Sequence, residues 1–424
     1  MIEQTLRQTF GYDSLRPGQE QAIRAVVAGR SAAAIFPTGS GKSLCYQLPA
    51  LLLPHLTLVV SPLLALMQDQ LAFLHRHGIA AASIDSAQSR EQTSETMARA
   101  KSGELKILMI SVERLKNERF RNFIAQVPIS LLVVDEAHCI SEWGHNFRPD
   151  YLKLPDYQRQ FGIAQVLLLT ATATPKVIAD MREKFAITEA DVVTTGFYRS
   201  NLNLLVEPVA GSAKLQRLQQ WLAPRRGQAS IVYVTQQKTA EQVAERLARD
   251  GLAVSAYHAG MAHEVRESIQ RRFMAGELEC IVATIAFGMG IDKRDIRNVV
   301  HFDLPKSVEN YSQEIGRAGR DGTPAEALLL YDPADIGRVR RLLDNIENPQ
   351  QLQVEQYKLN VMAAFAEAQT CRRQVLLNYF GEYNDKPCGN CDICLDPPQS
   401  YDGTEDAQKA LSCVWRVGQN FGVG

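Results

Sequence analysis

Short apolar runs alternate with longer, periodically apolar segments along most of this chain, and the whole pattern occurs twice. The first series includes SAAAIFP, TLVVSP, KILMIS, SLLVVD and QVLLLTATA, and the second includes ASIVYVT, ECIVAT, RNVVHFDLP and AEALLLYD. Uniformly apolar runs bounded by turn residues are typical of strands buried on both faces, as in parallel sheets covered by helices. We therefore predict an α/β fold with two doubly wound parallel-sheet domains in tandem and a cleft between them.

The two series meet near GFYRSNLNLLVEPVAG, which places the first domain at residues 1–198 and the second at 199–333. The strands stop after Pro333, and residues 334–397 are predicted to form a small helical module that ends in a cluster of cysteines. Residues 398–424 begin with the Asp, Pro and Gly content of a linker and end in one more predicted helix.

The net charge and the N-terminal sequence restrict the possible functions and cellular locations of the chain. The formal net charge is −1, so attraction to a polyanion must come from local basic grooves. The N-terminal MIEQTLRQTF contains Glu3 and leaves no room for the apolar core of a signal peptide, so we expect a cytoplasmic protein. The most apolar stretch, Leu48 to Met67, contains three prolines, and we predict a helix end, a strand and a helix start there instead of a membrane span.

The segment FPTGSGKS, residues 36–43, lies between an apolar strand and an apolar helix, as a phosphate-binding loop does. Gly39 and Gly41 allow close approach of the backbone to an anion, Lys42 can reach the β and γ phosphates, and Ser43 can hold Mg²⁺. Phe36 stands where the general pattern has its first glycine, and a glycine-rich turn before a helix is the alternative.

The segment VVDEAH, residues 133–138, weakens that alternative. Asp135 follows a buried strand, where an acid can coordinate Mg²⁺ through water, and Glu136 is placed to orient or deprotonate the attacking water. Both motifs, in order and on separate strands, predict that the first domain hydrolyses a nucleoside triphosphate.

Two further segments extend this site. QEIGRAGRDG, residues 313–322, places Arg317 and Arg320 on one face of a predicted helical turn, from which a guanidinium can stabilise γ-phosphate charge when the domains close. An exposed arginine pair is the alternative, although Gly316 and Gly319 indicate a close backbone approach. In the segment FGYDSLRPGQ, Tyr12 can stack on a base and Gln19 can pair with the N6/N7 edge of adenine. The alternative is that this segment is an ordinary turn without a role in binding.

Four of the eight cysteines are concentrated towards the C-terminus, with Cys371 on a predicted helix and Cys388, Cys391 and Cys394 at two-residue spacings, whereas Cys45, Cys139, Cys280 and Cys413 are scattered singly. Four thiolates so spaced can close a tetrahedral, structural Zn²⁺ site. An iron–sulfur cluster and disulfides are the alternatives, and a cytosolic setting favours a metal over disulfides.

Ordered motifs along nearly the whole chain resemble the RecQ family of superfamily 2 DNA helicases: LRPGQEQAI, TGSGKS, DEAHCISEWGHNFRPDY, LTATAT, YHAGM, VATIAFGMGID and YSQEIGRAGRDG. The resemblance implies two RecA-like domains and an ATP-dependent 3′ to 5′ DNA helicase of recombination and repair. Its partners would be DNA, as single strands and tailed or forked duplexes, and by resemblance alone a single-strand-binding protein; a bacterial member would be nucleoid-associated.

The same resemblance assigns residues. Those implied to bind ATP and Mg²⁺ are Tyr12, Arg16, Gln19, Thr38, Gly39, Ser40, Gly41, Lys42, Ser43 and Asp135. Those implied to act in hydrolysis are Lys42, Asp135, Glu136, Arg317 and Arg320. The cysteine cluster would bind zinc, with Arg372 and Arg373 as DNA contacts. Ser40 replaces a usual glycine, and no roles are transferred to YVTQQ at 233–237, which lacks the family wording.

A loop rich in aromatic residues follows the acidic motif, and in the family this loop senses single-stranded DNA and signals to the ATPase. Trp143 and Phe147 offer faces on which bases stack, and Arg148 offers a phosphate or cation–π contact. The resemblance also implies that His145 is one of these DNA-coupling residues. The alternative is that the rings of Trp143 and Phe147 pack into the domain core. Glu142 and Asn146 depart from the common Gln and Asp, so the strength of DNA stimulation is expected to differ.

The C-terminal DAQKALSCVWRVGQNFGVG resembles the opening helix of the family's winged-helix domain. We expect a truncated form, with weaker duplex binding and unwinding than full-length relatives. Two other functions stay open: a DNA-stimulated ATPase or translocase that does not separate strands, and a non-catalytic DNA-binding protein that uses ATP as a clamp. The residues alone also leave RNA open as a substrate.

Overall fold

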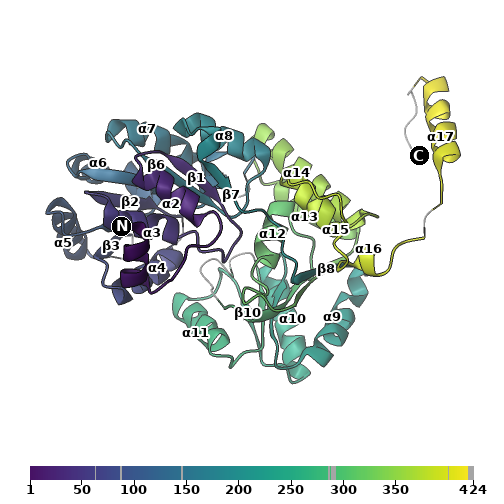
Figure 1. Ribbon diagram of the computed structural model, residues 1–424. Coiled ribbons are helices and arrows are strands. Elements are labelled where there is room, and N and C mark those ends of the chain that lie inside the picture. Colours follow the sequence, from purple (N-terminus) through teal and green to yellow (C-terminus); the bar gives the residue numbers. More distant parts are fainter. Residues whose placement is uncertain are drawn as a thin grey trace.

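The computed structural model describes residues 1–62, 64–85, 88–144, 147–284, 287, 293–399 and 401–418. Within these residues the strands form two parallel sheets in tandem, followed by a helical module (Figure 1). The predicted α/β class, with two RecA-like doubly wound domains, is confirmed.

The first sheet has seven strands in the order β3-β4-β2-β5-β6-β1-β7. Its strands are β1 (Ala32–Ile35), β2 (Leu56–Val60), β3 (Ala81–Ile84), β4 (Ile107–Ile110), β5 (Ile129–Val134), β6 (Val166–Thr170) and β7 (Val192–Thr194). Its helices are α1 (Ile2–Thr5), α2 (Gln19–Val27), α3 (Leu44–Leu52), α4 (Leu64–Arg76), α5 (Arg90–Lys101), α6 (Glu118–Ile124), α7 (Leu154–Gln160) and α8 (Pro175–Phe185).

The second sheet has six strands in the order β10-β11-β9-β12-β13-β8. Its strands are β8 (Leu202–Pro208), β9 (Ala229–Tyr233), β10 (Val254–Tyr257), β11 (Cys280–Ala283), β12 (Ile296–His301) and β13 (Ala325–Tyr331). Its helices are α9 (Lys214–Leu222), α10 (Gln237–Arg249), α11 (His263–Met274) and α12 (Val308–Ile315).

Alternate residues of each central strand enter different cores, which explains why the strands are apolar throughout. In β1, Ala33 and Ile35 pack with α5 to α8, whereas Ala32 and Ala34 pack with α2 to α4. The helices are amphipathic: α10 buries Ala240, Val243, Ala244 and Leu247, which recur at the spacing of one helix face.

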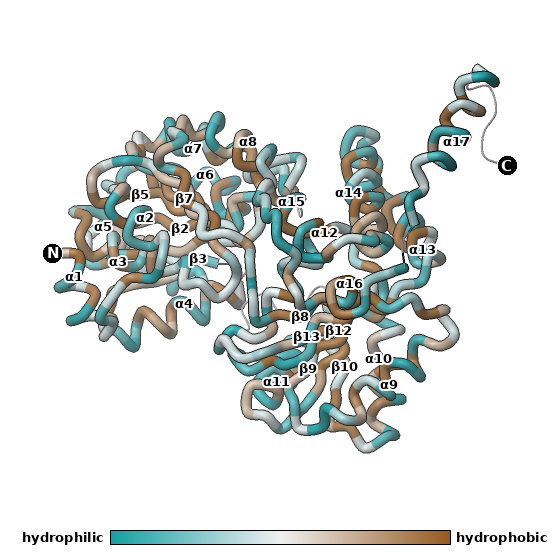
Figure 2. Tube along the Cα trace, turned by 45° about the vertical axis from the view of Figure 1, so that its right-hand side comes forward, coloured by the Kyte–Doolittle hydropathy of each residue, from teal (hydrophilic) through white to brown (hydrophobic). Residues whose placement is uncertain are grey.

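The helical module comprises α13 (Ala334–Leu343), α14 (Pro349–Glu367), α15 (Arg372–Tyr379) and α16 (Asp392–Leu395). Leu359, Met362 and Leu376 of this module belong to the same core as β8 and β12 of the second domain. The last helix, α17 (Thr404–Arg416), stands clear of the other helices, and hydrophobic and hydrophilic residues alternate along it (Figure 2). Trp415 on α17 is 81% exposed.

Candidate active site

The phosphate-binding loop predicted at residues 36–43 lies between the end of β1 and the start of α3. Gly39 and Gly41 have φ angles of +84° and +83°, a left-handed conformation that side chains other than glycine rarely adopt. The ammonium group of Lys42 donates a hydrogen bond to the carbonyl of Phe36 over 3.1 Å. Burial lowers the pKa of Lys42, whereas the nearby carboxylates of Glu136 and Asp135 act in the opposite direction. The loop therefore has the conformation of a phosphate-binding loop, with its two glycines at positive φ and the ammonium of Lys42 at its centre.

The segment before α2 braces this loop. Gln19 is buried, its amide oxygen accepts from the backbone N–H of Arg16 over 2.7 Å, and its amide nitrogen donates to the carbonyl of Gly41 over 2.8 Å. A Cβ atom at Gly41 would lie 2.6 Å from that nitrogen, so the glycine also makes room for Gln19. Arg16 donates to the carbonyl of Gly39 over 2.9 Å. The amide predicted to pair with adenine thus also ties the phosphate loop to α2.

The two acids follow β5. Asp135 accepts hydrogen bonds from the N–H of Glu136 over 3.0 Å and from the Ser61 hydroxyl over 3.4 Å. Burial, together with the charge of Glu136, raises the pKa of Asp135 to about 7. Burial also raises the pKa of Glu136, against the opposing charges of Lys42 and Arg317. Glu136 adopts a φ of +50°, an uncommon backbone conformation for a non-glycine residue that is held at this strand end.

His138 fixes the segment after the acids to the neighbouring strand β6. The Thr170 hydroxyl donates to the carbonyl of Thr172 over 3.2 Å, so it accepts from Nδ1–H of His138 over 2.8 Å. Nδ1 also lies 3.3 Å from the Glu136 carboxylate. Burial, followed by the charges of Lys358 and Lys42, lowers the pKa of His138 to about 3. The ring is therefore neutral and links the segment that follows β5 to strand β6.

Arg317 and Arg320 come from the second domain and line the same cavity as the phosphate loop and the two acids. The prediction that they share a helical turn was wrong, because α12 ends at Ile315 and Gly319 adopts a φ of +58° in the turns that follow. Arg320 crosses to the first domain, and its Cδ would lie 3.1 Å from a Cβ atom at Gly39. We call residues 316–323 the arginine turn.

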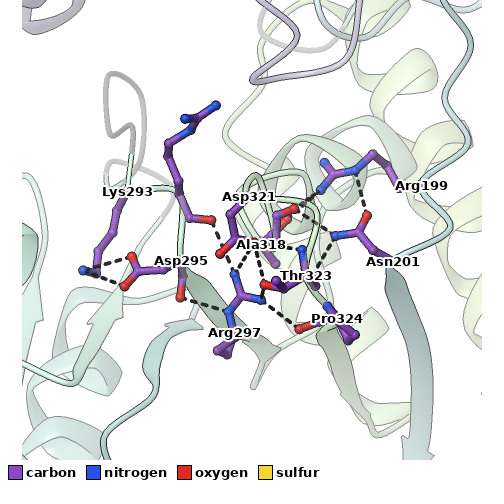
Figure 3. Close-up of polar contacts among 11 residues, drawn as sticks. Arg199, Asn201, Lys293, Asp295, Arg297, Ala318, Asp321, Thr323 and Pro324 are labelled. Atoms are coloured by element: carbon purple, nitrogen blue, oxygen red, sulfur yellow. Dashed lines mark hydrogen bonds and ion pairs between the residues drawn. The ribbon is translucent and has the colours of Figure 1, made fainter.

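Side chains from distant segments surround the arginine turn (Figure 3). Arg199 and Asn201, just before β8, donate to carbonyl groups of Ala318, Gly319 and Thr323. Arg297 of β12 pairs with Asp321 over 2.6 Å. The turn that carries the two arginines is therefore held from two sides.

The cavity between the domains has a volume of about 920 Å³. Its lining includes these predicted residues: Tyr12, Arg16, Gln19, Thr38, Gly39, Gly41, Lys42, Ser43, Asp135, Glu136, Arg317 and Arg320. Ser40 is not among the lining residues, and its hydroxyl donates to the carbonyl of Pro37 over 2.5 Å. Ser43 and Asp135 offer the oxygen ligands that Mg²⁺ prefers. Beside them, the phosphate loop and the cations of Lys42, Arg317 and Arg320 are suited to binding a triphosphate. The residues present therefore fit a nucleotide with its magnesium ion.

The aromatic loop begins directly after this site. Trp143 is half-buried, with the ammonium of Lys176 2.9 Å from the centre of its ring, and it packs at the edge of a first-domain core. Phe147 is also half-buried, and Arg148 pairs with Glu113 over 3.5 Å. His145 and Asn146 lie outside the described residues.

A lysine of the helical module reaches this loop. Lys358 of α14 is buried, and its ammonium donates to the carbonyl of Gly144 over 2.8 Å and pairs with Glu355 over 3.0 Å. A Cβ atom at Gly144 would lie 2.0 Å from the carbonyl oxygen of His138, so no larger residue fits there without a shift. The loop is therefore packed between the acidic motif and α14.

The sulfur atoms of Cys371, Cys388, Cys391 and Cys394 lie within 4.8 Å of one another, as four ligands of one ion would. The backbone N–H of Cys388 donates to the sulfur of Cys371 over 3.3 Å. The pKa of Cys371 is lowered to about 7: burial raises it, but hydrogen bonds from the cluster's backbone and neighbouring thiols outweigh burial. Burial raises the pKa of Cys388 and Cys391, so a metal ion would have to displace their protons. Four cysteine sulfur atoms brought together in this way fit a structural Zn²⁺ ion, which would bind them as thiolates.

Arg372 and Arg373, which we expected to contact DNA, are buried instead. Arg372 pairs with Asp392 over 3.0 Å and donates to the carbonyl of Phe365 over 2.7 Å. Arg373 donates to the carbonyl of Leu202 at the start of β8. Both guanidinium groups hold the module together and to the second domain, so the predicted DNA contacts were wrong.

Comparison with known proteins agrees with this arrangement. Consecutive segments match the families described as DEAD/DEAH box helicase (residues 16–181), helicase conserved C-terminal domain (213–322), RecQ zinc-binding (333–395) and RQC domain (397–424). The ATP-dependent DNA helicase RecQ of Haemophilus influenzae is 45% identical over 419 residues, which are 99% of this chain and 67% of that protein. The chain belongs to the RecQ family.

A second RecQ protein, the ATP-dependent DNA helicase RecQ of Bacillus subtilis, is 42% identical over 97% of this chain and 70% of its own length. The chain thus spans about two thirds of its RecQ relatives. The RecQ zinc-binding match covers Cys371, Cys388, Cys391 and Cys394, which supports zinc over an iron–sulfur cluster or disulfides.

More distant solved structures share the fold alone. Dbp5 of S. cerevisiae bound to RNA and ADP BeF3 has a TM-score of 0.62 and 17% identity, covering 84% of this RecQ chain and 96% of Dbp5. The helicase MrfA bound to DNA has a TM-score of 0.64 and 20% identity, covering 87% of this chain and 54% of MrfA.

Sequence reasoning missed several residues that the RecQ structure brings to these sites. Gln270, Arg294 and Gln313 line the cavity from the second domain. Lys358 and Asn201 hold loops from more than a hundred residues away, and no local pattern marks a single polar residue for such a contact. None of the helices in the described part of the chain has the length and apolarity needed to cross a membrane.

Proposed function

We propose that this RecQ-family chain hydrolyses ATP with Mg²⁺ in the interdomain cleft and uses it to move 3′ to 5′ along single-stranded DNA. Movement into tailed or forked duplexes separates their strands during recombination and repair. The observation that carries the proposal is one cavity that contains Lys42 and Glu136 of the first domain together with Arg317 and Arg320 of the second.

In the proposed reaction the first domain holds the triphosphate. The N–H groups of the loop at 38–43 and the ammonium of Lys42 bind its phosphates. Tyr12 and Gln19 line the same cavity and would contact the nucleotide's base. Bound Mg²⁺, held by Ser43 and through water by Asp135, would neutralise charge on the β and γ phosphates.

Glu136 accepts the proton of the attacking water, and burial suits it to this role because a carboxylate with a raised pKa is a stronger base. Arg317 and Arg320 stabilise the charge that develops on the γ-phosphate. Since these arginines belong to the other domain, hydrolysis requires a closed cleft.

DNA acts through the aromatic loop in this proposal. Bases stack on Trp143 and Phe147, and the loop begins only a few residues after Glu136, so displacement of the loop reaches the catalytic acid. The contact of Lys358 with Gly144 links the same loop to the zinc-binding module.

The first test is steady-state ATP hydrolysis without nucleic acid, with single-stranded DNA and with single-stranded RNA, using Lys42→Ala as the blank. We expect strong stimulation by DNA alone, followed by unwinding of 3′-tailed but not 5′-tailed duplexes. Hydrolysis that is indifferent to DNA would contradict the motor and favour a DNA-binding protein clamped by ATP. Stimulation without unwinding would favour a translocase.

Trp143→Ala tests the role of the loop. The variant should bind single-stranded DNA with affinity reduced by about 1–3 kcal/mol at most, the value of one stacked base, and lose DNA-stimulated hydrolysis. Tyr383→Ala is the control, since Tyr383 is 83% exposed and lies outside the loop. Unchanged stimulation in Trp143→Ala would remove Trp143 from the coupling.

A further inference from the structure

The segment that connects the two domains, residues 195–201, makes specific contacts with the arginine turn. Arg199 Nη2 donates to the carbonyls of Ala318 and Gly319, each over 2.9 Å. Asn201 Nδ2 donates to the carbonyls of Gly319 over 2.8 Å and Thr323 over 2.9 Å (Figure 3). Ala318 and Gly319 lie between Arg317 and Arg320, so the connector grips the backbone that carries both guanidinium groups.

The fit between Asn201 and the turn is close. Gly319 adopts a φ of +58°, and a Cβ atom there would lie 2.6 Å from Asn201 Nδ2. The N–H of Gly319 donates to the carbonyl of Ile296 over 2.9 Å, which closes the other side of the turn. The glycine is thus needed both for its backbone conformation and for the space that the asparagine amide occupies.

The opposite side of the connector contacts the zinc-binding module. Asn390, between two of the cysteines, donates to the carbonyl of Ser200 over 2.9 Å and to the side-chain oxygen of Asn203 over 3.0 Å. Glu382 accepts from the backbone N–H of Phe197 over 2.6 Å. The connector is therefore fixed between the module and the arginine turn, and its position is defined on both sides.

We propose that Asn201 and Arg199 are positioning residues for ATP hydrolysis, which hold the arginine turn so that Arg317 and Arg320 face the phosphate loop. Neither residue lines the nucleotide cavity, so each acts through the turn and not on the nucleotide. The proposal rests on the function proposed above. Its physical basis is that four donated hydrogen bonds attach the carbonyls of Ala318, Gly319 and Thr323 to the connector, in addition to the turn's own hydrogen bond from the N–H of Gly322 to the carbonyl of Gly319.

The decisive variant is Asn201→Asp, which keeps the shape of the side chain but sets a carboxylate oxygen against the carbonyls of Gly319 and Thr323. We expect kcat for DNA-stimulated ATP hydrolysis to fall about tenfold or more, with KM for ATP nearly unchanged, because the phosphate loop belongs to the other domain. Asn203→Asp is the matched control: its oxygen still accepts from Asn390, it does not touch the turn, and its kcat should stay near the wild-type value.

A double-mutant cycle separates positioning from general damage. If Asn201 acts through the turn, Asn201→Asp should add little to the loss already caused by removing both arginines in Arg317→Ala/Arg320→Ala. Losses that multiply, or an unchanged kcat in a folded Asn201→Asp variant, would overturn the proposal. If that variant fails to fold, as shown by its melting temperature and zinc content, Arg199→Met enters the same cycle in its place.

Hydrogen exchange gives a readout without catalysis. The amides of Gly319 and Asp321 should exchange faster in Asn201→Asp, whereas those of β9 and β11 should not change. Should wild-type protein show no DNA-stimulated hydrolysis, the proposed function fails, and the exchange comparison still decides whether Asn201 holds the turn; equal exchange rates would show that it does not.

Discussion

The two sides of the nucleotide cleft are built differently. On the first-domain side the contacts that shape the phosphate loop join residues close in sequence: Lys42 donates to the carbonyl of Phe36, six residues away, and Gln19 donates to that of Gly41, 22 residues away. On the second-domain side, Arg199 and Asn201 hold the arginine turn from 118 to 122 residues away. A binding surface can thus be encoded locally, whereas the arginine side exists only once the second domain and its connector are folded.

This difference separates two properties of the protein. Affinity for nucleotide should depend mainly on the first side, and the rate of hydrolysis should depend on both sides. The following variants test whether nucleotide affinity and the rate of hydrolysis can be changed separately.

Arg320→Ala should have the largest effect. Removing an arginine that stabilises the transferred phosphate lowers hydrolysis by about 10³–10⁵-fold, while ATP affinity should change little because the phosphate loop is intact. Stopped-flow nucleotide binding and steady-state hydrolysis measure the two properties. Arg341→Ala, at an exposed position on α13, is the control. A comparable loss of ATP affinity in Arg320→Ala would contradict the expectation that affinity depends mainly on the first-domain side.

Lys42→Ala should lower both properties. Loss of the cation at the centre of the phosphate loop should reduce hydrolysis by about 10²–10³-fold and weaken nucleotide binding as well. The exposed Lys101 provides the control variant Lys101→Ala. Normal ATP affinity in Lys42→Ala, measured by the same stopped-flow method, would show that the loop's backbone alone holds the triphosphate.

Removal of zinc should affect the second side more than the first. The module fixes the connector through Asn390 and Glu382, so a metal-free protein should lose order around the arginine turn and lose DNA-stimulated hydrolysis. Nucleotide binding should persist. Metal analysis, calorimetry and nucleotide titration before and after chelation measure these effects, and restored hydrolysis on adding Zn²⁺ is the control. Loss of nucleotide binding on chelation would contradict the expectation.

His138→Gln should produce the smallest effect, and it concerns stability. The folded pKa of His138, about 3, lies below its ordinary value of 6.5, so the unfolded chain binds the proton more readily. The neutral His138 ring therefore contributes to the free energy of unfolding above about pH 6.5, and this contribution is lost as the pH falls towards 3. At pH 5 the loss in free energy of unfolding is about 2 kcal/mol.

The variant should therefore be less sensitive than wild type to lowering the pH from 7 to 5 in urea unfolding. His263→Gln, at an exposed histidine, should retain the wild-type dependence. Identical pH dependence in His138→Gln and wild type would mean that His138 is not the neutral link described above.

Local patterns explain why much of the fold and site could be predicted from the sequence. Strand, phosphate loop, acidic pair and cysteine cluster each depend on residues close in sequence, so their spacing carries the information. The errors arise where a distant group decides the structure. Arg373 was expected on the surface, but the carbonyl that accepts its hydrogen bond is that of Leu202, 171 residues away. Asn201 and Lys358 have no local pattern at all.

The connector also limits how the cleft can close. Residues from Phe197 onward are fixed to the zinc-binding module and the arginine turn, while Thr194 is paired with Ile35 in the first sheet. Thr195 is also tied to the first sheet, because its N–H donates to the carbonyl of Ile35 over 3.4 Å, so only Gly196, with a φ of +81°, lies between the two anchored points. Because so short a tether keeps these two anchored points together, we expect domain closure to be a rotation near Gly196 and not a sliding of one domain past the other.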